Sequence, residues 1–482
     1  MNLSRVGMRV LAGLLCVALT ACVTTPRART AQSVEVWATS RDGQRKLASL
    51  PALPLVPVSN DAAGAMTITV DPARRGQPMV GFGAAMTDSS AIVIGRLPAR
   101  QRAEVMTDLF GRKGLGISFL RVPIGASDFS VEHYSLDDVP MGERDPDLAH
   151  FSLQQPRQHQ IPALREARAL NPDLTIMASP WSAPAWMKDT GSLIKGQLRG
   201  DAYGAYARYF VRYLDAMQHE RLPVRYISVQ NEPHFEPADY PGMRFDPPDR
   251  ARFLKETLGP ALEHRRQAVG VLEYDHNWDR PQDPMAVLDD PAAARHVAGV
   301  AWHCYGGDPG TMEQVRLSHP DKDVFLTECS GGEWTPDWGD ALEWMTDALI
   351  ITATRSGSRG TLLWNLALDE NHGPHRGGCG NCRGVVTIDG ATGAVTRNVE
   401  YYVLGQVSRF VPPGSRRISS EGEGAVRHVA FRTPTGRLVL LTHNATKAPV
   451  TVTVRIGGRQ FVATLPKGEV MTFLWNEGMP RS

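Results

Sequence analysis

Residues 227–235 read ISVQNEPHF, a run of β-forming residues that ends in an amide, a carboxylate and a proline. A carboxylate at the end of an apolar strand costs desolvation free energy unless it is paired or used in chemistry. Taken alone, Glu232 in this stretch starts a polar loop. A functional role for Glu232 therefore requires a second carboxylate in an equivalent position.

Eight short β-rich runs of this kind alternate with helical patterns between residues 80 and 410. They read MVGFGAA, ISFLRVPIG, LTIMASPW, RYISVQNE, AVGVLEYD, HVAGVAWHCY, DVFLTECS and GTLLWNLAL. Helices are predicted at residues 97–111, with Pro98 in the first turn and Gly111 past the end, and at 201–220. This alternation predicts an α/β fold, a closed (β/α)8 TIM barrel. A Gly-rich phosphate loop opening a helix would favour an open sheet instead, but GFGAAMTD does not match that motif well.

The chain changes character after Pro412-Pro413-Gly414, where short β-runs are separated by Gly, Pro and Asn turns. This pattern predicts a small accessory antiparallel β-sandwich. Two further β-runs, SVEVWATS and AMTITV, precede the barrel, so the sandwich can draw on both ends of the chain. The predicted organisation is sandwich strands at 33–78, the catalytic barrel at 79–411 and the C-terminal sandwich at 412–482.

The N-terminus has the pattern of an export signal, with two arginines before an apolar run at residues 10–19 that is too short for a comfortable membrane span. The following Leu-Thr-Ala-Cys resembles the lipobox of bacterial lipoproteins. We therefore expect a signal peptide at 1–21, lipidation of Cys22, a tether at 22–32 and anchoring to a bacterial membrane, in the periplasm or at the cell surface. The alternative is an ordinary signal peptide cut near Ala21.

The chain carries 52 basic and 51 acidic residues, so its charge indicates no nucleic-acid partner. Beyond the leader it has four cysteines, Cys304, Cys329, Cys379 and Cys382. The GCGNC segment fits a disulfide, a redox pair or half of a zinc site. Export favours a disulfide, and no second CxxC completes a zinc site. Whether Cys304 bonds to Cys329 stays open.

Almost every predicted strand ends in a polar or aromatic residue, and in a TIM barrel catalytic groups lie at these ends. The candidates are Asp88, Arg121, Trp181, Asn231, Glu232, His303, Tyr305, Glu328, Trp364 and Asn365. Glu328 supplies the second carboxylate. Two carboxylates in a pocket lined by aromatic and amide groups indicate glycoside hydrolysis, since one protonates the leaving oxygen while the other attacks or activates water. The charge of Glu328 should hold the proton on Glu232. The alternative for each Glu is an ion pair or a helix cap.

Seven motifs in this order, GFGAAMTDSSA, LRVPIGASDFS, ASPWSAPAWMK, ISVQNEP, AWHCY, FLTECS and LLWNLALDE, resemble glycoside hydrolase family 30, the family of lysosomal glucosylceramidase. The resemblance spans roughly residues 80–410. It implies retaining hydrolysis of β-glycosides through a covalent glycosyl-enzyme. Glu232 would be the acid/base and Glu328 the nucleophile. No organic cofactor and no metal is expected.

The resemblance also implies a set of sugar-binding residues around this pair. Asn231 would bond the 2-hydroxyl, Asp88 and Trp181 would hold the far hydroxyls of the sugar, and Trp364 would stack under it. The residues expected around the nucleophile are Arg121, His303 and Tyr305, with Tyr305 as a donor to it.

The expected activity is that of a glucosylceramidase-like exo-β-glucosidase, which acts on a glycolipid or an oligosaccharide and so touches sphingolipid or carbohydrate metabolism. The loop at residues 369–385 is unlike that of the lysosomal enzyme, which puts this preference in doubt and leaves an endo-β-1,6-glucanase, a β-xylosidase or a β-fucosidase as alternatives. Its His372, His375 and Cys379 are expected to be solvated or substrate-facing, with a metal site as the lesser alternative. A non-enzymatic alternative is a carbohydrate-binding surface lipoprotein.

Overall fold

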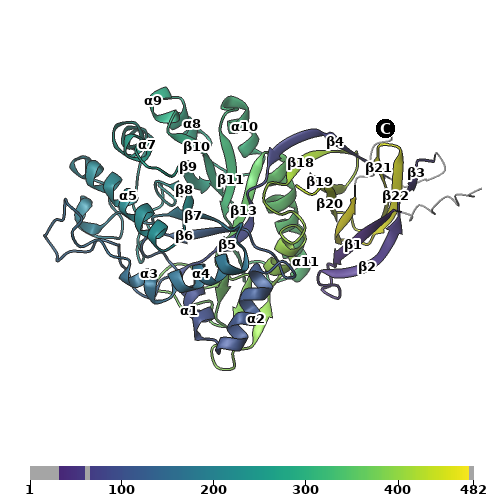
Figure 1. The fold of residues 1–482 in the computed structure, drawn as a ribbon, viewed down its shortest axis with the longest axis horizontal. Helices are drawn as coiled ribbons and strands as arrows, with labels where there is room; N and C mark the ends of the chain where they lie inside the picture. The colour runs from purple at the N-terminus through teal and green to yellow at the C-terminus, as the bar shows by residue number, and fades with distance from the viewer. Residues whose placement is uncertain (1–31, 60–65, 477–482) are drawn as a thin grey trace, which may run out of the picture. The chain divides into compact units, whose positions relative to one another are not determined.

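The computed structural model describes residues 32–59 and 66–476, and its central element is a closed barrel of eight parallel strands (Figure 1). The barrel is formed by β5 (Gly81–Ala85), β6 (Phe119–Pro123), β7 (Thr175–Ser179), β8 (Val224–Ser228), β9 (Gly270–Asn277), β10 (Val297–His303), β11 (Asp323–Glu328) and β13 (Ser358–Leu363). These are the eight predicted runs, so the TIM-barrel prediction is confirmed.

Helices connect the barrel strands and cover their outer surface. Both helices predicted individually are present as α2 (Ala99–Phe110), which Gly111 caps, and α5 (Tyr203–His219). The others are α1 (Asp88–Arg96), α3 (Gln154–Gln158), α4 (Gln160–Leu170), α6 (Pro247–Phe253), α7 (Gly259–Glu263), α8 (Gln282–Leu288), α9 (Pro291–Ala294), α10 (Thr311–Ser318), α11 (Trp338–Trp344), α12 (Ala353–Arg355) and α13 (Val399–Gly405). Short 3-10 turns are η1 (Ala185–Met187) and η2 (Gly200–Ala202), and π-helical turns are η3 (Leu254–Leu258) and η4 (Met345–Thr352).

One hydrophobic cluster fills part of the barrel interior. Seven of the barrel strands contribute one side chain each, and the residue before β5 contributes another. Its members are Val80, Phe119, Met177, Tyr226, Leu272, Ala301, Phe325 and Leu362. Side chains of a strand alternate between its two faces, so the next inward layer lies two residues further along. That layer contains Arg121, Ser179, Ser228, His303 and Thr327. The barrel interior therefore changes from an apolar layer to a polar layer over two residues along the strands.

The accessory sandwich is a ten-stranded sheet that takes strands from both ends of the chain. Its strands are β1 (Ser33–Thr39), β2 (Ala48–Pro54), β3 (Val56–Pro57), β4 (Met66–Pro78), β18 (Arg416–Glu421), β19 (Val426–Arg432), β20 (Arg437–Asn444), β21 (Val450–Ile456), β22 (Arg459–Leu465) and β23 (Val470–Asn476). The predicted accessory sandwich is confirmed; its ladders are antiparallel apart from the one between β4 and β21, which is parallel. The parallel ladder arises where a strand preceding the barrel is inserted beside strands that follow it.

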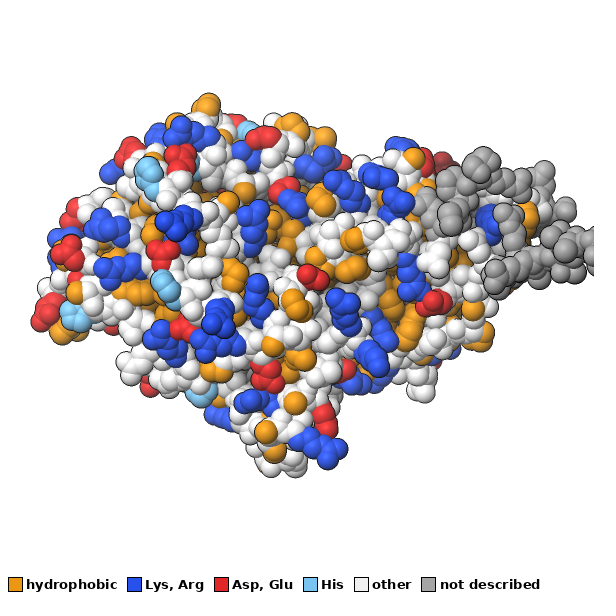
Figure 2. Space-filling view, in the orientation of Figure 1, with side chains coloured by type: hydrophobic (Ala, Val, Ile, Leu, Met, Phe, Trp, Pro, Cys, Tyr) orange, Lys and Arg blue, Asp and Glu red, His pale blue; other side chains and the backbone are white. Residues whose placement is uncertain are grey.

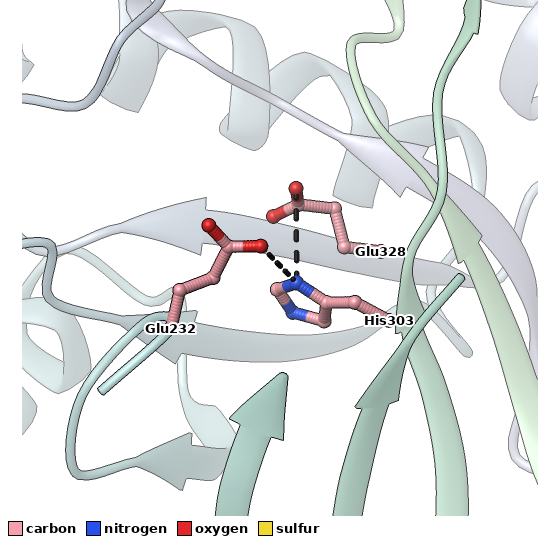
Figure 3. A group of neighbouring side chains, drawn as sticks. All are labelled: Glu232, His303 and Glu328. Carbon is pink, nitrogen blue, oxygen red and sulfur yellow. Dashed lines mark hydrogen bonds and ion pairs between the residues drawn. The ribbon is translucent and has the colours of Figure 1, made fainter. Parts of the chain in front are cut away.

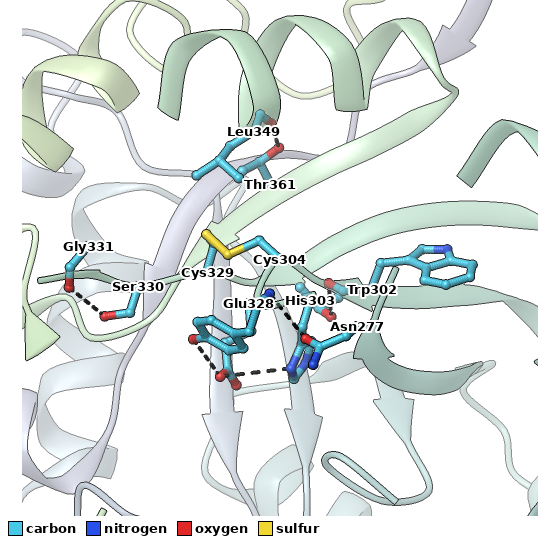
Figure 4. Close-up of a disulfide and its surroundings, with 12 residues drawn as sticks. Asn277, Trp302, His303, Cys304, Glu328, Cys329, Ser330, Gly331, Leu349 and Thr361 are labelled. Carbon is cyan, nitrogen blue, oxygen red and sulfur yellow. Dashed lines mark hydrogen bonds and ion pairs between the residues drawn. A yellow bond between two sulfur atoms is a disulfide. The ribbon is translucent and has the colours of Figure 1, made fainter. Parts of the chain in front are cut away.

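Two disulfides join cysteines close to the carboxyl ends of the barrel strands. Cys304 and Cys329 follow β10 and β11, and their bond lies on the opposite side of the backbone from the side chains of His303 and Glu328 (Figure 4). Cys379 bonds to Cys382, which belongs to β15 (Cys382–Arg383). β15 pairs with β12 (Gly331–Gly332). A small neighbouring sheet contains β14 (Ala367–Leu368), β16 (Val386–Ile388) and β17 (Val395–Arg397).

The export signal, Cys22 and all but the last residue of the tether lie outside the described residues, so they remain predictions. Among residues 32–59 and 66–476, no helix is both long enough and apolar enough to cross a membrane. Basic and acidic side chains are interspersed over the face shown in Figure 2, with hydrophobic side chains between them. This distribution agrees with the near balance of charge in the sequence.

Candidate active site

The side chains of Glu232, His303 and Glu328 converge at the carboxyl ends of the barrel strands (Figure 3). One oxygen of each carboxylate and a ring nitrogen of His303 all lie within 4.8 Å of one another. His303 is the last residue of β10 and Glu328 the last of β11, whereas Glu232 lies four residues beyond β8. The backbone N–H of Glu232 donates to the Asp275 carbonyl at 3.0 Å, and this bond places the Glu232 backbone beside β9.

Both oxygens of Glu328 accept hydrogen bonds. Nη1 of Arg121 donates to Oε2, and the Tyr305 hydroxyl donates to Oε1 at 2.9 Å. Arg121 is fully buried and also donates from Nη2 to Asn231 Oδ1 at 2.7 Å. A carboxylate that receives a guanidinium and a phenol is held in one orientation, with its charge compensated. Glu232 accepts one such bond, from His303 at 3.1 Å.

Asp275 lies at the centre of the polar layer and was not singled out from the sequence. Its carboxylate accepts from Arg121 Nη2, Ser179, Ser228 and Thr327 at 2.6–2.7 Å and from His303 Nε2 at 3.0 Å. Along β9, Tyr274 pairs with Ala301 and His276 with Trp302, so Asp275 is left unpaired in a bulge. Tyr274 and Asp275 both have positive φ angles, 76° and 55°. The bulge turns the Asp275 side chain into the barrel.

The charges in this layer are strongly coupled. Burial opposes the ionised form of Asp275, but Arg121 and the hydrogen bonds outweigh it and hold the pKa of Asp275 well below its usual range. Burial also opposes the charged form of His303. The charge of Glu328 and the hydrogen bonds to Asp275 and Glu232 outweigh it, and they raise the pKa of His303 to about 9. His303 is therefore an imidazolium near neutral pH, and a metal ion could bind it only by displacing this proton.

The two catalytic candidates respond differently to their surroundings. Burial and the charge of Glu232 raise the pKa of Glu328, although His303 and Arg121 oppose the rise. Burial raises the pKa of Glu232 as well, but the hydrogen bond from His303 and the charges of His276, His303 and Arg121 together outweigh it, so the pKa of Glu232 is lowered. In the substrate-free site the order is thus opposite to the prediction that Glu328 holds the proton on Glu232. The reason is the imidazolium of His303 between Glu232 and Asp275.

A hollow of about 350 Å³ opens above this pair, within the usual range for ligand sites. Asp128 lies in it with Oδ2 accepting from Trp364 Nε1 at 3.3 Å and with Oδ1 lacking a partner. Burial and the charge of Glu328 raise the pKa of Asp128 to about 8. Trp181 stacks on Trp364 with ring centroids 5.1 Å apart. The residues lining the hollow are Asp128, Glu232, Phe235, Tyr240, His276, Asn277, Tyr305, Glu328, Trp334, Trp364, Cys379 and Cys382.

The sugar contact that the family resemblance implied for Asp88 stays a prediction. It begins α1, its carboxylate accepts from Ser130 at 2.7 Å and from Tyr134 at 3.0 Å, and it is absent from the lining of the hollow. A carboxylate that does line the hollow is Asp128, from the GASDFS segment after β6. The signal for Asp128 was an acidic residue shortly after a barrel strand.

The remaining predicted residues gather at the site: Arg121, Trp181, Asn231, His303, Tyr305 and Trp364. In the loop after β13, Cys379 is in a disulfide. His372 contacts Cys382 O and Glu333, and His375 contacts Gly377 O. The disulfide removes Cys379 as a thiolate ligand for a metal ion. Phe235 and Trp334 also line the hollow, and nothing in the sequence beyond their aromatic character indicated this.

We expect Asp275→Asn to lower the free energy of unfolding by about 3–5 kcal/mol near neutral pH, because the buried Arg121 loses an anionic partner. A depressed carboxyl pKa stabilises the fold above the unfolded-state pKa of about 3.9, and that contribution is lost as the pH falls below it. The difference between wild type and variant should therefore shrink below about pH 4. Denaturant titrations of both proteins near neutral pH and below about pH 4 measure this difference in unfolding free energy. An equal difference at the two pH values would contradict the charge-based explanation.

Comparison with known proteins identifies the family. The model of the glycosyl hydrolase family 30 TIM-barrel domain matches residues 79–411, and the model of the family's beta sandwich domain matches residues 414–473. The chain belongs to glycosyl hydrolase family 30. The resemblance read from the motifs is thereby confirmed, and this family 30 chain is a glycosidase.

Relatives of this family 30 chain differ in their named substrates. It is 32% identical over 500 residues to endo-1,6-beta-D-glucanase neg1 of Aspergillus fumigatus, covering 97% of the chain and 99% of the relative. It is 28% identical over 468 residues to mouse lysosomal acid glucosylceramidase, covering 91% and 88%. A solved endo-beta1,6-glucanase superimposes with a TM-score of 0.86 at 29% identity, covering 92% of this chain and 99% of that one.

Proposed function

We propose that this protein is a retaining endo-β-1,6-glucanase. The observation that carries the reaction type is the close approach of two carboxylates, with one oxygen of each within 4.8 Å. Retaining glycosidases hold their carboxyl groups about 5–5.5 Å apart, whereas inverting enzymes leave about 6.5–9.5 Å for a water molecule. The short distance between the two oxygens favours the retaining arrangement, in which one carboxylate attacks the sugar directly.

Hydrogen-bond donors assign the two roles. Glu328 receives Arg121 and Tyr305 on its two oxygens, so the site is built for its anion, the form that attacks the anomeric carbon. Glu232 shares a proton with His303 and is the member of that pair that lines the hollow. Glu232 therefore passes this proton to the leaving oxygen and then, as a base, activates water against the glycosyl-enzyme. A bound sugar excludes water and strengthens the attraction of Arg121 for Glu328.

Three further groups fit a glucosyl ring above the pair. The unpartnered Oδ1 of buried Asp128 is an acceptor for a sugar hydroxyl. Trp364 lines the same hollow and offers an indole face to the apolar side of the sugar. Asn231 Oδ1 accepts a hydrogen bond from Arg121, so Nδ2 is the Asn231 atom that remains to bond the 2-hydroxyl of the sugar. Trp181 supports Trp364 from behind by stacking.

The substrate class rests on the relatives. Endo-1,6-beta-D-glucanases match nearly the full length of this chain, and the solved one has the same fold over almost all of it. The lysosomal glucosylceramidase is more distant. The relatives therefore favour a polysaccharide substrate over the glycolipid that the sequence motifs indicated.

Purified protein incubated with β-1,6-glucan, glucosylceramide and aryl β-glucoside, β-xyloside and β-fucoside tests this proposal. We expect rapid shortening of the glucan with release of oligosaccharides, and retention of the β-configuration in the first product seen by NMR. Release of glucose alone, or preference for glucosylceramide, would overturn the endo-glucanase assignment. Product of α-configuration would overturn the retaining mechanism.

A further inference from the structure

The mouth of the active-site hollow is ringed by exposed aromatic side chains. Among the described residues, four large aromatic side chains are exposed: Phe235 (47%), Tyr305 (45%), Trp334 (52%) and Trp344 (47%). Three of them, all but Trp344, line this one hollow. Exposed indole and phenyl faces cost solvation free energy, so their concentration at one mouth points to a ligand that covers them.

Trp334 is held rigidly. Its indole lies across Gly332, where an added Cβ would come within 2.0 Å of a ring carbon. Gly332 belongs to β12, which pairs with Cys382 of β15, and Glu333 N–H donates to Asn381 O at 3.0 Å. The Cys379–Cys382 disulfide closes the partner segment. Since the loop is fixed at several points, binding to Trp334 costs little conformational entropy.

Another part of the mouth is formed by the segment that follows Glu232. Phe235 N–H donates to Glu232 O at 2.8 Å, and the Phe235 ring contacts the Tyr240 ring with centroids 6.4 Å apart. Asp128 and Trp364 are buried in the hollow, whereas Phe235 and Trp334 are exposed. The cleaved sugar fits the buried end, so its leaving oxygen, which Glu232 protonates, points toward the exposed aromatic residues.

We propose that Trp334 and Phe235 form a leaving-group subsite that stacks the next glucosyl unit of a β-glucan chain. The proposal rests on the function proposed above, since it requires that Glu232 protonate a sugar leaving group. A sugar presents apolar C–H faces that pack on aromatic rings, and its hydroxyls stay in water at this open mouth. During retaining catalysis the same subsite holds the acceptor that attacks the glycosyl-enzyme.

The test compares wild type, Trp334→Ala, Phe235→Ala and the control Trp344→Ala, an exposed indole at the end of α11 outside this hollow. Covering roughly 60 Å² of an aromatic face at ~25 cal/mol per Å² corresponds to about a tenfold effect. We expect kcat/KM on β-1,6-glucan to fall about tenfold in each rim variant. An aryl β-glucoside with a small aglycone should be affected by less than about threefold.

A second readout isolates the leaving-group side. An aryl β-glucoside is supplied with a β-1,6-linked glucose disaccharide as acceptor, and transfer products are counted against free glucose. We expect wild type and Trp344→Ala to transfer, and Trp334→Ala to transfer about tenfold less, with Trp334→Phe partly restoring transfer. Melting temperatures check that each variant is folded.

The outcomes separate the two proposals. If wild type fails to shorten β-1,6-glucan, the proposed function is wrong and the subsite falls with it. If wild type hydrolyses it and transfers, but Trp334→Ala does both equally well, the function stands and the subsite is wrong. A rim variant that loses activity on glucosylceramide while keeping it on the glucan would identify a lipid-binding surface and also overturn the sugar subsite.

Discussion

Glu328→Gln should reduce turnover of every β-glycoside on the order of 10⁵-fold, the scale seen when a hydrolase loses its nucleophile. The amide preserves the shape of the side chain but cannot form the glycosyl ester. It keeps one oxygen for Arg121 or Tyr305, so the fold should survive. Initial rates with an aryl β-glucoside and with β-1,6-glucan measure the loss, and wild-type-like activity with either would remove Glu328 from the nucleophile role.

The matched control for this variant is Glu273→Gln. Glu273 is a fully buried carboxylate on β9 that pairs with buried Arg250 at 2.7 Å, away from the hollow. Its replacement also breaks a buried carboxylate–guanidinium pair, so it should lower stability. Its kcat should stay near the wild-type value. A loss of turnover as large as that of Glu328→Gln would mean that the Glu328 effect is structural.

Glu232→Ala should slow glycosides with poor leaving groups by about 10²–10⁴-fold, the usual contribution of general acid catalysis. An activated aryl glucoside needs no proton at its leaving oxygen, so its glycosylation step should be affected much less. Azide needs no general base, so it should restore turnover of that substrate. A plot of rate against leaving-group pKa measures the effect, and equal losses for all leaving groups would contradict the assignment.

The configuration of the azide product distinguishes the two carboxylates. In Glu232→Ala, azide attacks a glycosyl-enzyme formed on Glu328 and yields the β-glucosyl azide. If Glu232 were the nucleophile, azide would displace the leaving group directly and yield the α-azide. This measurement is decisive because the pKa directions of the substrate-free site favour the opposite order of protonation.

The positions of Glu232 and Glu328 could be predicted because the features that place them are local. Each carboxylate comes at or just beyond the end of a strand whose β-forming residues are contiguous in the sequence. Eight such strands alternating with helices close into a barrel, and parallel strands bring their carboxyl ends to one edge. The fold and the positions of the two glutamates therefore follow from short-range patterns.

The roles of Asp88 and Asp128 could not be separated in this way. Both acidic residues follow a barrel strand, and both have a pKa that burial raises. Asp128 lines the hollow, whereas Asp88 is not among its lining residues and accepts hydrogen bonds from Ser130 and Tyr134. Which carboxylate lines the hollow is thus decided by neighbours distant in sequence.

The sequence by itself determined the barrel, the family and the two glutamates, because hydrophobic periodicity and strand ends are properties of contiguous residues. Tertiary structure alone decided three other features: the inward turn of Asp275, the proton shared by His303 and Glu232, and the rim at Trp334. Asp275 turns inward because a bulge shifts the register of β9 against β10. The proton and the rim depend on side chains and disulfides that only folding brings together, and electrostatic free energies are set by those distances.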